Sequence, residues 1–258
     1  MSLIDTHAHL NDARLLPSVP DIVSSMEMDG VDKIINVGYS RQSSEISVDL
    51  ANSYKNIYCS VGIHPHDSKD ATQADYEYFI SVSQNPKLVA IGEIGLDYYY
   101  NLSDESIQKR VFVEQLELAN SLSLPIIIHL RDAYADMFTL LSQNKHYLNH
   151  GVVLHCYSGT SDDLKQYQSI TDMYVSVGGA ITFKNNASRK DVIAQVPINL
   201  LLLETDCPYM TPVPHRGTIN YPKYVKFVAS KLIDWFPDRD IITETNNNAK
   251  RLFDKLRN

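Results

Sequence analysis

The chain has 258 residues, of which 44% are hydrophobic and 21% charged, as in ordinary globular proteins. Its 23 Lys and Arg stand against 31 Asp and Glu, which gives a formal net charge of −8 at pH 7. This acidic balance argues against a protein that coats duplex DNA through a broad cationic face, although a local basic groove for one strand stays compatible with it.

Short apolar runs recur along the chain, and helix-length segments separate them. Eight of these runs are predicted strands, at residues 3–4, 33–37, 57–61, 88–91, 125–128, 152–154, 173–177 and 200–203. Apolar residues repeat with helical spacing in 111–122 and 224–235, and 240–256 is predicted as a closing helix. Strands that alternate with helices pair in parallel, and eight such units in a chain of this length favour a TIM-type (β/α)8 barrel over an open sheet.

The chain between these elements carries no Gly/Ser linker or charge block, so we expect a single domain over residues 1–258. Cys59, Cys156 and Cys207 are too few and too widely spaced for a disulfide framework or a cysteine-type zinc site, which predicts free thiols. No apolar run approaches the ~18 residues of a membrane span, and no cationic leader precedes Leu3. We therefore expect a soluble cytoplasmic protein with no membrane partner, and we favour a monomer.

Polar residues gather where six of the predicted strands end. The motifs are DTHAH (5–9), GIHPH (62–66), GEIG (92–95), HLRD (129–132), HCYSG (155–159) and ETD (204–206). Six of the nine histidines lie in these motifs. Because the carboxyl ends of barrel strands meet at one mouth, where catalytic groups collect, the sequence predicts a functional site there.

The residue types in these motifs indicate a metal centre. His7 and His9 are two positions apart on a strand, so both side chains project to the same side and can bind one ion. The other candidate ligands are His129, His155, Glu93 and Asp206. Any one histidine could be a hydrogen-bonded core residue, but six unpaired polar groups at one end would be costly. Four imidazoles and two carboxylates exceed the needs of one tetrahedral zinc and suit two divalent ions, with Mg, Mn and Zn all acceptable.

Seven segments resemble the TatD family of metal-dependent deoxyribonucleases, within the amidohydrolase superfamily. They are IDTHAHL (4–10), GIHPH (62–66), GEIGLDYY (92–99), PIIIHLRDA (125–133), LHCYSG (154–159), LLETDCPYMTPVPHRG (202–217) and NNAKRLF (247–253). They follow the family order over nearly the whole chain, and the sixth is the most specific together with GEIGLD. The resemblance implies that His7, His9 and Asp206 hold one ion and that His129 and His155 hold the second, with Glu93 shared between them.

The resemblance also implies an activity, largely the 3′→5′ exonucleolytic cleavage of single-stranded DNA and sometimes of RNA. A smaller branch of the family removes D-amino acids from mischarged tRNA. We expect metal ions to lower the pKa of a bound water and Asp206 to act as the general base, with Glu93 as the second catalytic carboxylate. Hydrolysis of another ester, amide or lactone at the same metals is an alternative, and a non-enzymatic, metal-carrying role in a repair assembly is a third.

Five residues are candidate substrate contacts: His64, Arg131, Lys184, His215 and Arg216. His64 ends a strand and would face the phosphate. Arg131 shares the side of the strand that carries a ligand and could clamp a phosphate, unless it pairs with a neighbouring acid, Asp132 or Glu204. Lys184 follows a glycine pair that allows close approach or simply makes a tight turn. Prolines rigidify the loop of His215 and Arg216, so His215 could contact substrate or only fasten the loop.

Three tyrosines in a row, Tyr98 to Tyr100, follow the fourth predicted strand. An exposed tyrosine beside a metal-binding strand end could stack on an unpaired base. We expect at least one of the three to pack in the core instead.

Overall fold

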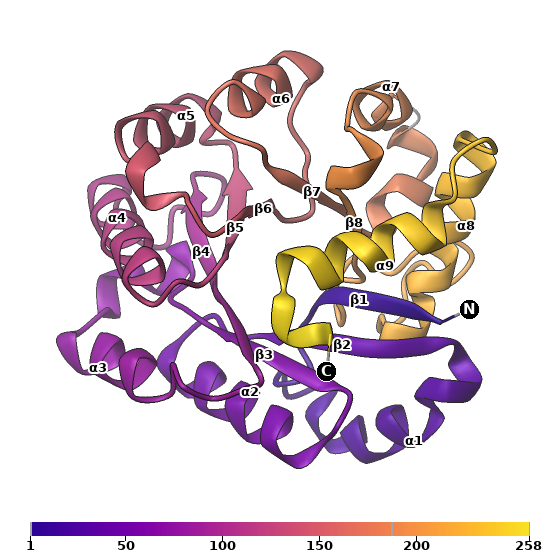
Figure 1. The fold of residues 1–258 in the computed structure, drawn as a ribbon, viewed down its shortest axis with the longest axis horizontal. Coiled ribbons are helices and arrows are strands. Elements are labelled where there is room, and N and C mark those ends of the chain that lie inside the picture. Colours follow the sequence, from indigo (N-terminus) through magenta and orange to yellow (C-terminus); the bar gives the residue numbers. More distant parts are fainter. Residues whose placement is uncertain (1, 187, 258) are drawn as a thin grey trace.

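Eight parallel strands form a barrel in the computed structural model, which describes residues 2–186 and 188–257. The strands are hydrogen-bonded in chain order: β1 (Leu3–Ala8), β2 (Val31–Val37), β3 (Ile57–Val61), β4 (Leu88–Asp97), β5 (Ile126–Arg131), β6 (Val152–Leu154), β7 (Tyr174–Val177) and β8 (Leu201–Leu203). A bridge between Ala8 and Cys207 joins the last strand to the first, so the ring is nearly closed. The predicted TIM-type (β/α)8 fold is confirmed (Figure 1).

Helices surround the strands (Figure 1). They are α1 (Val19–Asp29), α2 (Arg41–Ser53), α3 (Gln73–Ser81), α4 (Glu105–Ser121), α5 (Tyr134–Gln143), α6 (Ser161–Gln168), α7 (Arg189–Ala194), α8 (Val225–Trp235) and α9 (Ile241–Leu252). Short 3-10 turns lie between them: η1 (Leu16–Ser18), η2 (Pro65–Asp70), η3 (Lys145–Tyr147), η4 (Gly179–Thr182), η5 (Lys184–Asn186), η6 (Ile198–Leu200), η7 (Pro222–Tyr224) and η8 (Asp254–Arg257). Within the described ranges, no helix is long and apolar enough to span a membrane.

The closing helix differs from the prediction over 240–256. The α-helix ends at Leu252, and η8 follows it. The ring of Phe253 is buried among Ile4, Leu202 and other side chains inside the barrel. Lys255 donates to the carbonyl oxygens of residues 85 and 88, where β4 begins. This segment therefore covers the amino ends of the strands and leaves their carboxyl ends to the site.

Three strands run further than expected. β1 continues to Ala8, β4 to Asp97 and β5 to Arg131, so all three carry residues of their polar motifs inside the sheet. The ladder of β4 with β5 includes the pair Gly95–His129, with a register shift just before it. Gly95 has a φ of +147° and a Cβ there would lie 2.0 Å from the carbonyl oxygen of His129, so only glycine fits.

Candidate metal centre

The mouth of the barrel collects the six candidate ligands. His7 lies on β1, Glu93 on β4 and His129 on β5. His9 and His155 come directly after β1 and β6, and Asp206 follows shortly after β8. His7, His9, His155 and Glu93 are each at most 7% exposed. The parallel strands therefore bring imidazoles and carboxylates from six positions of the sequence to one buried place.

One group of donor atoms forms around His7 and His9. Their Nε2 atoms lie 3.1 Å apart. Oε2 of Glu93 is 3.5 Å from each of them. Oδ1 of Asp206 lies 3.5 Å from Nε2 of His9 and 3.9 Å from Nε2 of His7. Two imidazole nitrogens and two carboxylate oxygens converge in this way, a set that accepts a divalent cation.

A second group forms on the other oxygen of Glu93. Nδ1 of His129 lies 2.7 Å from Oε1 of Glu93. Nε2 of His155 is 3.7 Å from the same oxygen, and Nε2 of His64 is 3.8 Å from it. Because its two oxygens face different imidazoles, Glu93 is placed to be shared between two cations.

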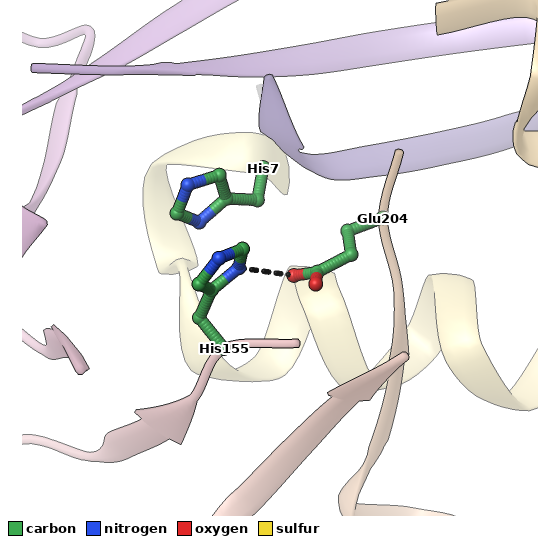
Figure 2. A group of neighbouring side chains, drawn as sticks. All are labelled: His7, His155 and Glu204. Carbon is green, nitrogen blue, oxygen red and sulfur yellow. Dashed lines mark hydrogen bonds and ion pairs between the residues drawn. The ribbon is translucent and has the colours of Figure 1, made fainter. Parts of the chain in front are cut away.

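In His9 and His155, the hydrogen bond made by Nδ1 determines which ring nitrogen faces the cluster. Nδ1 of His9 lies 3.0 Å from the carbonyl oxygen of Val37, which can only accept, so this nitrogen carries the proton. Nδ1 of His155 donates in the same way to Glu204, at 3.0 Å (Figure 2). Both Nε2 atoms are therefore free to bind a metal ion, and the donor set fits such an ion.

Glu204 orients His155 instead of completing the cluster. Its second oxygen accepts a hydrogen bond from the backbone N–H of Cys156 at 2.8 Å, and its side chain is fully buried. The ring of His155 also lies face to face with that of His7, with centroids 3.6 Å apart (Figure 2). The position of this ring is therefore fixed from two sides.

Asp97 has the corresponding role for His129. Its Oδ2 lies 2.9 Å from Nε2 of His129 and 3.0 Å from Nε2 of His66. Its Oδ1 accepts the backbone N–H groups of Tyr99 and Tyr100. Burial alone would raise the pKa of Asp97, but the hydrogen bonds of His129 and His66 lower it well below its usual value.

The seam between β1 and β8 is held by Asp5, which is fully buried. Its two oxygens accept the backbone N–H of Thr205 at 2.9 Å and the hydroxyl of Thr205 at 2.6 Å. The N–H of Asp206 then donates to the carbonyl oxygen of His7 at 2.9 Å. Candidate ligands from the two ends of the chain thus share one hydrogen-bonded frame.

Sequence reasoning did not assign these supporting roles to Asp5, Asp97 or Glu204. A signal existed for Asp97, because Glu93 and Asp97 share a face if the fourth strand is continued past residue 91. For Glu204 the signal was its spacing of two residues before Asp206.

The carboxylates of the cluster are ionised. Burial raises the pKa of Glu93, but the nearby His155 and the hydrogen bonds of His129 and His7 lower it well below its usual value. Burial opposes ionisation of Asp206 too, and the hydrogen bond of His9 lowers its pKa overall. Asp206 has a φ of +57°, a conformation that aspartate tolerates better than most residues.

His64 is a hydrogen-bond donor toward the cluster. Its Nδ1 accepts the backbone N–H of His66 at 3.1 Å, so the proton of the neutral ring lies on Nε2. Burial and the neighbouring His129 lower the pKa of His64 well below its usual value, which keeps the ring neutral. A neutral ring in this tautomer offers an N–H to a substrate oxygen and no lone pair to a metal.

The two arginine candidates stack on aromatic rings. The guanidinium of Arg131 lies 3.8 Å from the ring centre of Tyr99, and among the described residues no carboxylate pairs with it. Within the described residues, Arg131 therefore forms no ion pair with Asp132 or Glu204. Arg216 stacks on Phe183 at 3.6 Å.

Two further candidates lie around the loop after β8. His215 stacks on Tyr224 with ring centroids 4.4 Å apart and planes 6° apart, which fastens the loop beside α8. Lys184 lies in η5 and makes no side-chain hydrogen bond or ion pair within residues 2–186 and 188–257. The structure thus places His64 and Glu93 together, whereas Lys184 and His215 contact no cluster residue in the described ranges.

The tyrosine trio divides as expected. Tyr98 packs against the core, and its hydroxyl donates to Asp136 at 2.7 Å. Tyr99 and Tyr100 are exposed.

Comparisons with known proteins extend over nearly the whole chain. The profile of the family described as TatD related DNase matches residues 4–254. YabD of Bacillus subtilis, named an uncharacterized metal-dependent hydrolase, is 38% identical over 253 residues, which are 97% of this chain and 98% of the relative. A protein of Escherichia fergusonii named 3′-5′ ssDNA/RNA exonuclease TatD is 30% identical and covers 97% and 98%. The crystal structure of YjjV, a TatD homologue of Escherichia coli, superposes with a TM-score of 0.90 at 28% identity over 98% of both chains.

Proposed function

The chain belongs to the TatD-related DNase family of metal-dependent hydrolases, and we propose that it shortens single-stranded DNA, and RNA, from the 3′ end by hydrolysing phosphodiester bonds. The observation that carries the proposal is the bridging position of Glu93, whose two oxygens each face a separate group of imidazoles. The name of the exonuclease relative supports the choice of a nucleic-acid substrate.

In this proposal the cluster holds two divalent cations. His7, His9 and Asp206 would bind one, and two more residues, His129 and His155, would bind the other, with a shared Glu93. Mg, Mn and Zn each suit such imidazole and carboxylate donors. When bound, such ions lower the pKa of water toward neutrality and withdraw electron density from phosphate oxygens.

The side chains around the cluster divide the remaining work. Asp206 is ionised and close to the donor atoms of His9, so it can accept the proton of the attacking water. His64 donates its Nε2–H toward a non-bridging phosphate oxygen. Arg131 supplies a positive charge that no carboxylate in the described residues neutralises. A neutral ester or amide would need no such cation, and this difference favours a phosphodiester.

The test is a nuclease assay on end-labelled single-stranded oligonucleotides with metal-stripped protein and added Mg, Mn or Zn. We expect stepwise shortening that requires a metal and that Asp206→Asn reduces by at least about a hundredfold. Asp132→Asn is the matched control, since Asp132 has nearly the same φ, +56°, at an exposed position of the mouth. It should keep full activity. No shortening with any metal would refute the nuclease, and D-aminoacyl-tRNA would be the next substrate.

Metal binding has its own readout in thermal unfolding. A ligand that binds only the folded protein at a hundred times its Kd stabilises it by about 2.7 kcal/mol. For 258 residues this raises Tm by about 5–10 °C. We expect this rise for the unmodified protein and a smaller one for Glu93→Gln. An equal Tm with chelator and with metal would exclude metal binding by the cluster.

A further inference from the structure

Two exposed tyrosines and an arginine form a platform beside the metal cluster, made of Tyr99, Tyr100 and Arg131. The tyrosines are 59% and 55% exposed. The guanidinium lies 3.8 Å from the ring centre of Tyr99 and 4.9 Å from that of Tyr100. The two rings are nearly perpendicular, with centroids 4.8 Å apart. Each ring thus has a defined orientation although it faces solvent.

The platform is connected to the cluster through a single carboxylate. Oδ1 of Asp97 accepts the N–H groups of Tyr99 and Tyr100 at 3.0 and 3.1 Å. Oδ2 of the same residue lies 2.9 Å from Nε2 of His129, whose Nδ1 faces Glu93. The side-chain amide of Gln108 holds the backbone of Asp97: its Oε1 accepts the N–H of Asp97, and its Nε2 donates to the carbonyl oxygen of Asp97. The distance between platform and cluster is therefore fixed by hydrogen bonds that are buried or partly buried.

The chemistry of the platform matches an unpaired nucleobase. Bases of any sequence stack on aromatic rings and on guanidinium planes, while an unpaired cation beside them attracts the phosphates. The protein is acidic overall, with a formal charge of −8, so the positive charge of Arg131 attracts a strand to this place on the surface. A small ester or lactone would use neither exposed ring.

We propose that Tyr99, Tyr100 and Arg131 bind one base of the strand whose phosphodiester bond lies at the cluster. The proposal rests on the proposed nuclease function and adds to it a requirement for a base. The enzyme then selects unpaired strands, because a base within a duplex offers no free face to the platform.

The test compares two oligonucleotides of equal length and charge, an oligothymidylate and a chain of abasic sugar phosphates. Binding is measured by fluorescence anisotropy with metal present in the Asp206→Asn background, where the oligonucleotide stays intact. We expect the oligothymidylate to bind about tenfold more tightly than the abasic chain. The double variant Tyr99→Leu/Tyr100→Leu should remove this difference, whereas Tyr99→Phe/Tyr100→Phe should keep it because the rings remain.

Tyr54→Leu is the matched control for the loss of a tyrosine. Tyr54 follows the carboxyl end of α2 and lies at the opposite end of the barrel, so the preference for bases should persist. Equal binding of the two oligonucleotides, or an unchanged preference in the leucine double variant, would overturn the platform. The nuclease function is judged separately, by cleavage with the unmodified protein, so either proposal can fail while the other stands.

Discussion

A single buried carboxylate, Asp97, orients one side of the candidate metal cluster. Its Oδ2 forms a hydrogen bond with Nε2 of His129, while Nδ1 of the same ring faces Glu93. Such a partner fixes the ring and makes its metal-binding nitrogen a stronger donor. We therefore expect Asp97→Asn to weaken metal binding by about 10–100-fold without unfolding the protein. Calorimetric titration of metal into stripped protein measures the affinity, and circular dichroism checks the fold.

Asp136→Asn provides the comparison for this variant. Asp136 accepts hydrogen bonds from Tyr98 and Lys109 nearer the surface and contacts no cluster residue in the described chain. Its loss should leave the affinity for metal unchanged. If Asp97→Asn bound metal as tightly as the unmodified protein, Asp97 would not position His129.

The residues that converge at the mouth could be read from the sequence, but their partners could not. Spacing placed His7 and His9 on one side of a strand, and the repeated strand ends implied that the other candidates join them. The stacking of His215 on Tyr224 depends on the path of a proline-containing loop relative to α8. No local pattern encodes such a contact.

At the scale of elements, the sequence predicted the starts of strands better than their ends. Buried apolar runs mark where a parallel strand begins. In β4 the polar residues and glycines after residue 91 disfavour a strand by propensity, but pairing with the neighbouring β5 keeps them in the sheet as far as Asp97. The same tertiary effect lengthens β1, and it ends α9 early, where Phe253 turns into the barrel.

The covering of the amino ends by α9 and η8 yields a prediction for stability. Phe253 is 1% exposed and packs with Ile4 and Leu202. We expect Phe253→Ala to lower the free energy of unfolding by about 3–5 kcal/mol, because the cavity it leaves cannot collapse between strands. Urea denaturation measures this loss. The neighbouring Asp254 is exposed, so Asp254→Ala should change stability by less than about 0.5 kcal/mol. Similar losses for both variants would show that the terminal segment does not close the barrel.

At the scale of the molecule, net charge and function have to be reconciled. A formal charge of −8 repels a nucleic acid, whereas the proposed substrate is a polyanion. The cations proposed to contact it are few: Arg131, Lys184 and Arg216. On the proposed function, strand binding would depend on a few phosphate contacts, on stacking and on a bound metal, and we expect it to be only moderately sensitive to salt.

For single strands the logarithm of affinity falls with the logarithm of salt concentration with a slope of about −0.7 for each neutralised phosphate. Three contacts predict a slope of about −2 for oligothymidylate binding in the Asp206→Asn background, and Lys184→Gln should reduce it to about −1.4. Lys231→Gln is the control, because Lys231 lies near the carboxyl end of α8, away from the mouth, and should leave the slope unchanged. A slope steeper than about −5 would mean that the strand runs over a much broader cationic surface than these three residues provide, and the mouth would then be only part of the binding site.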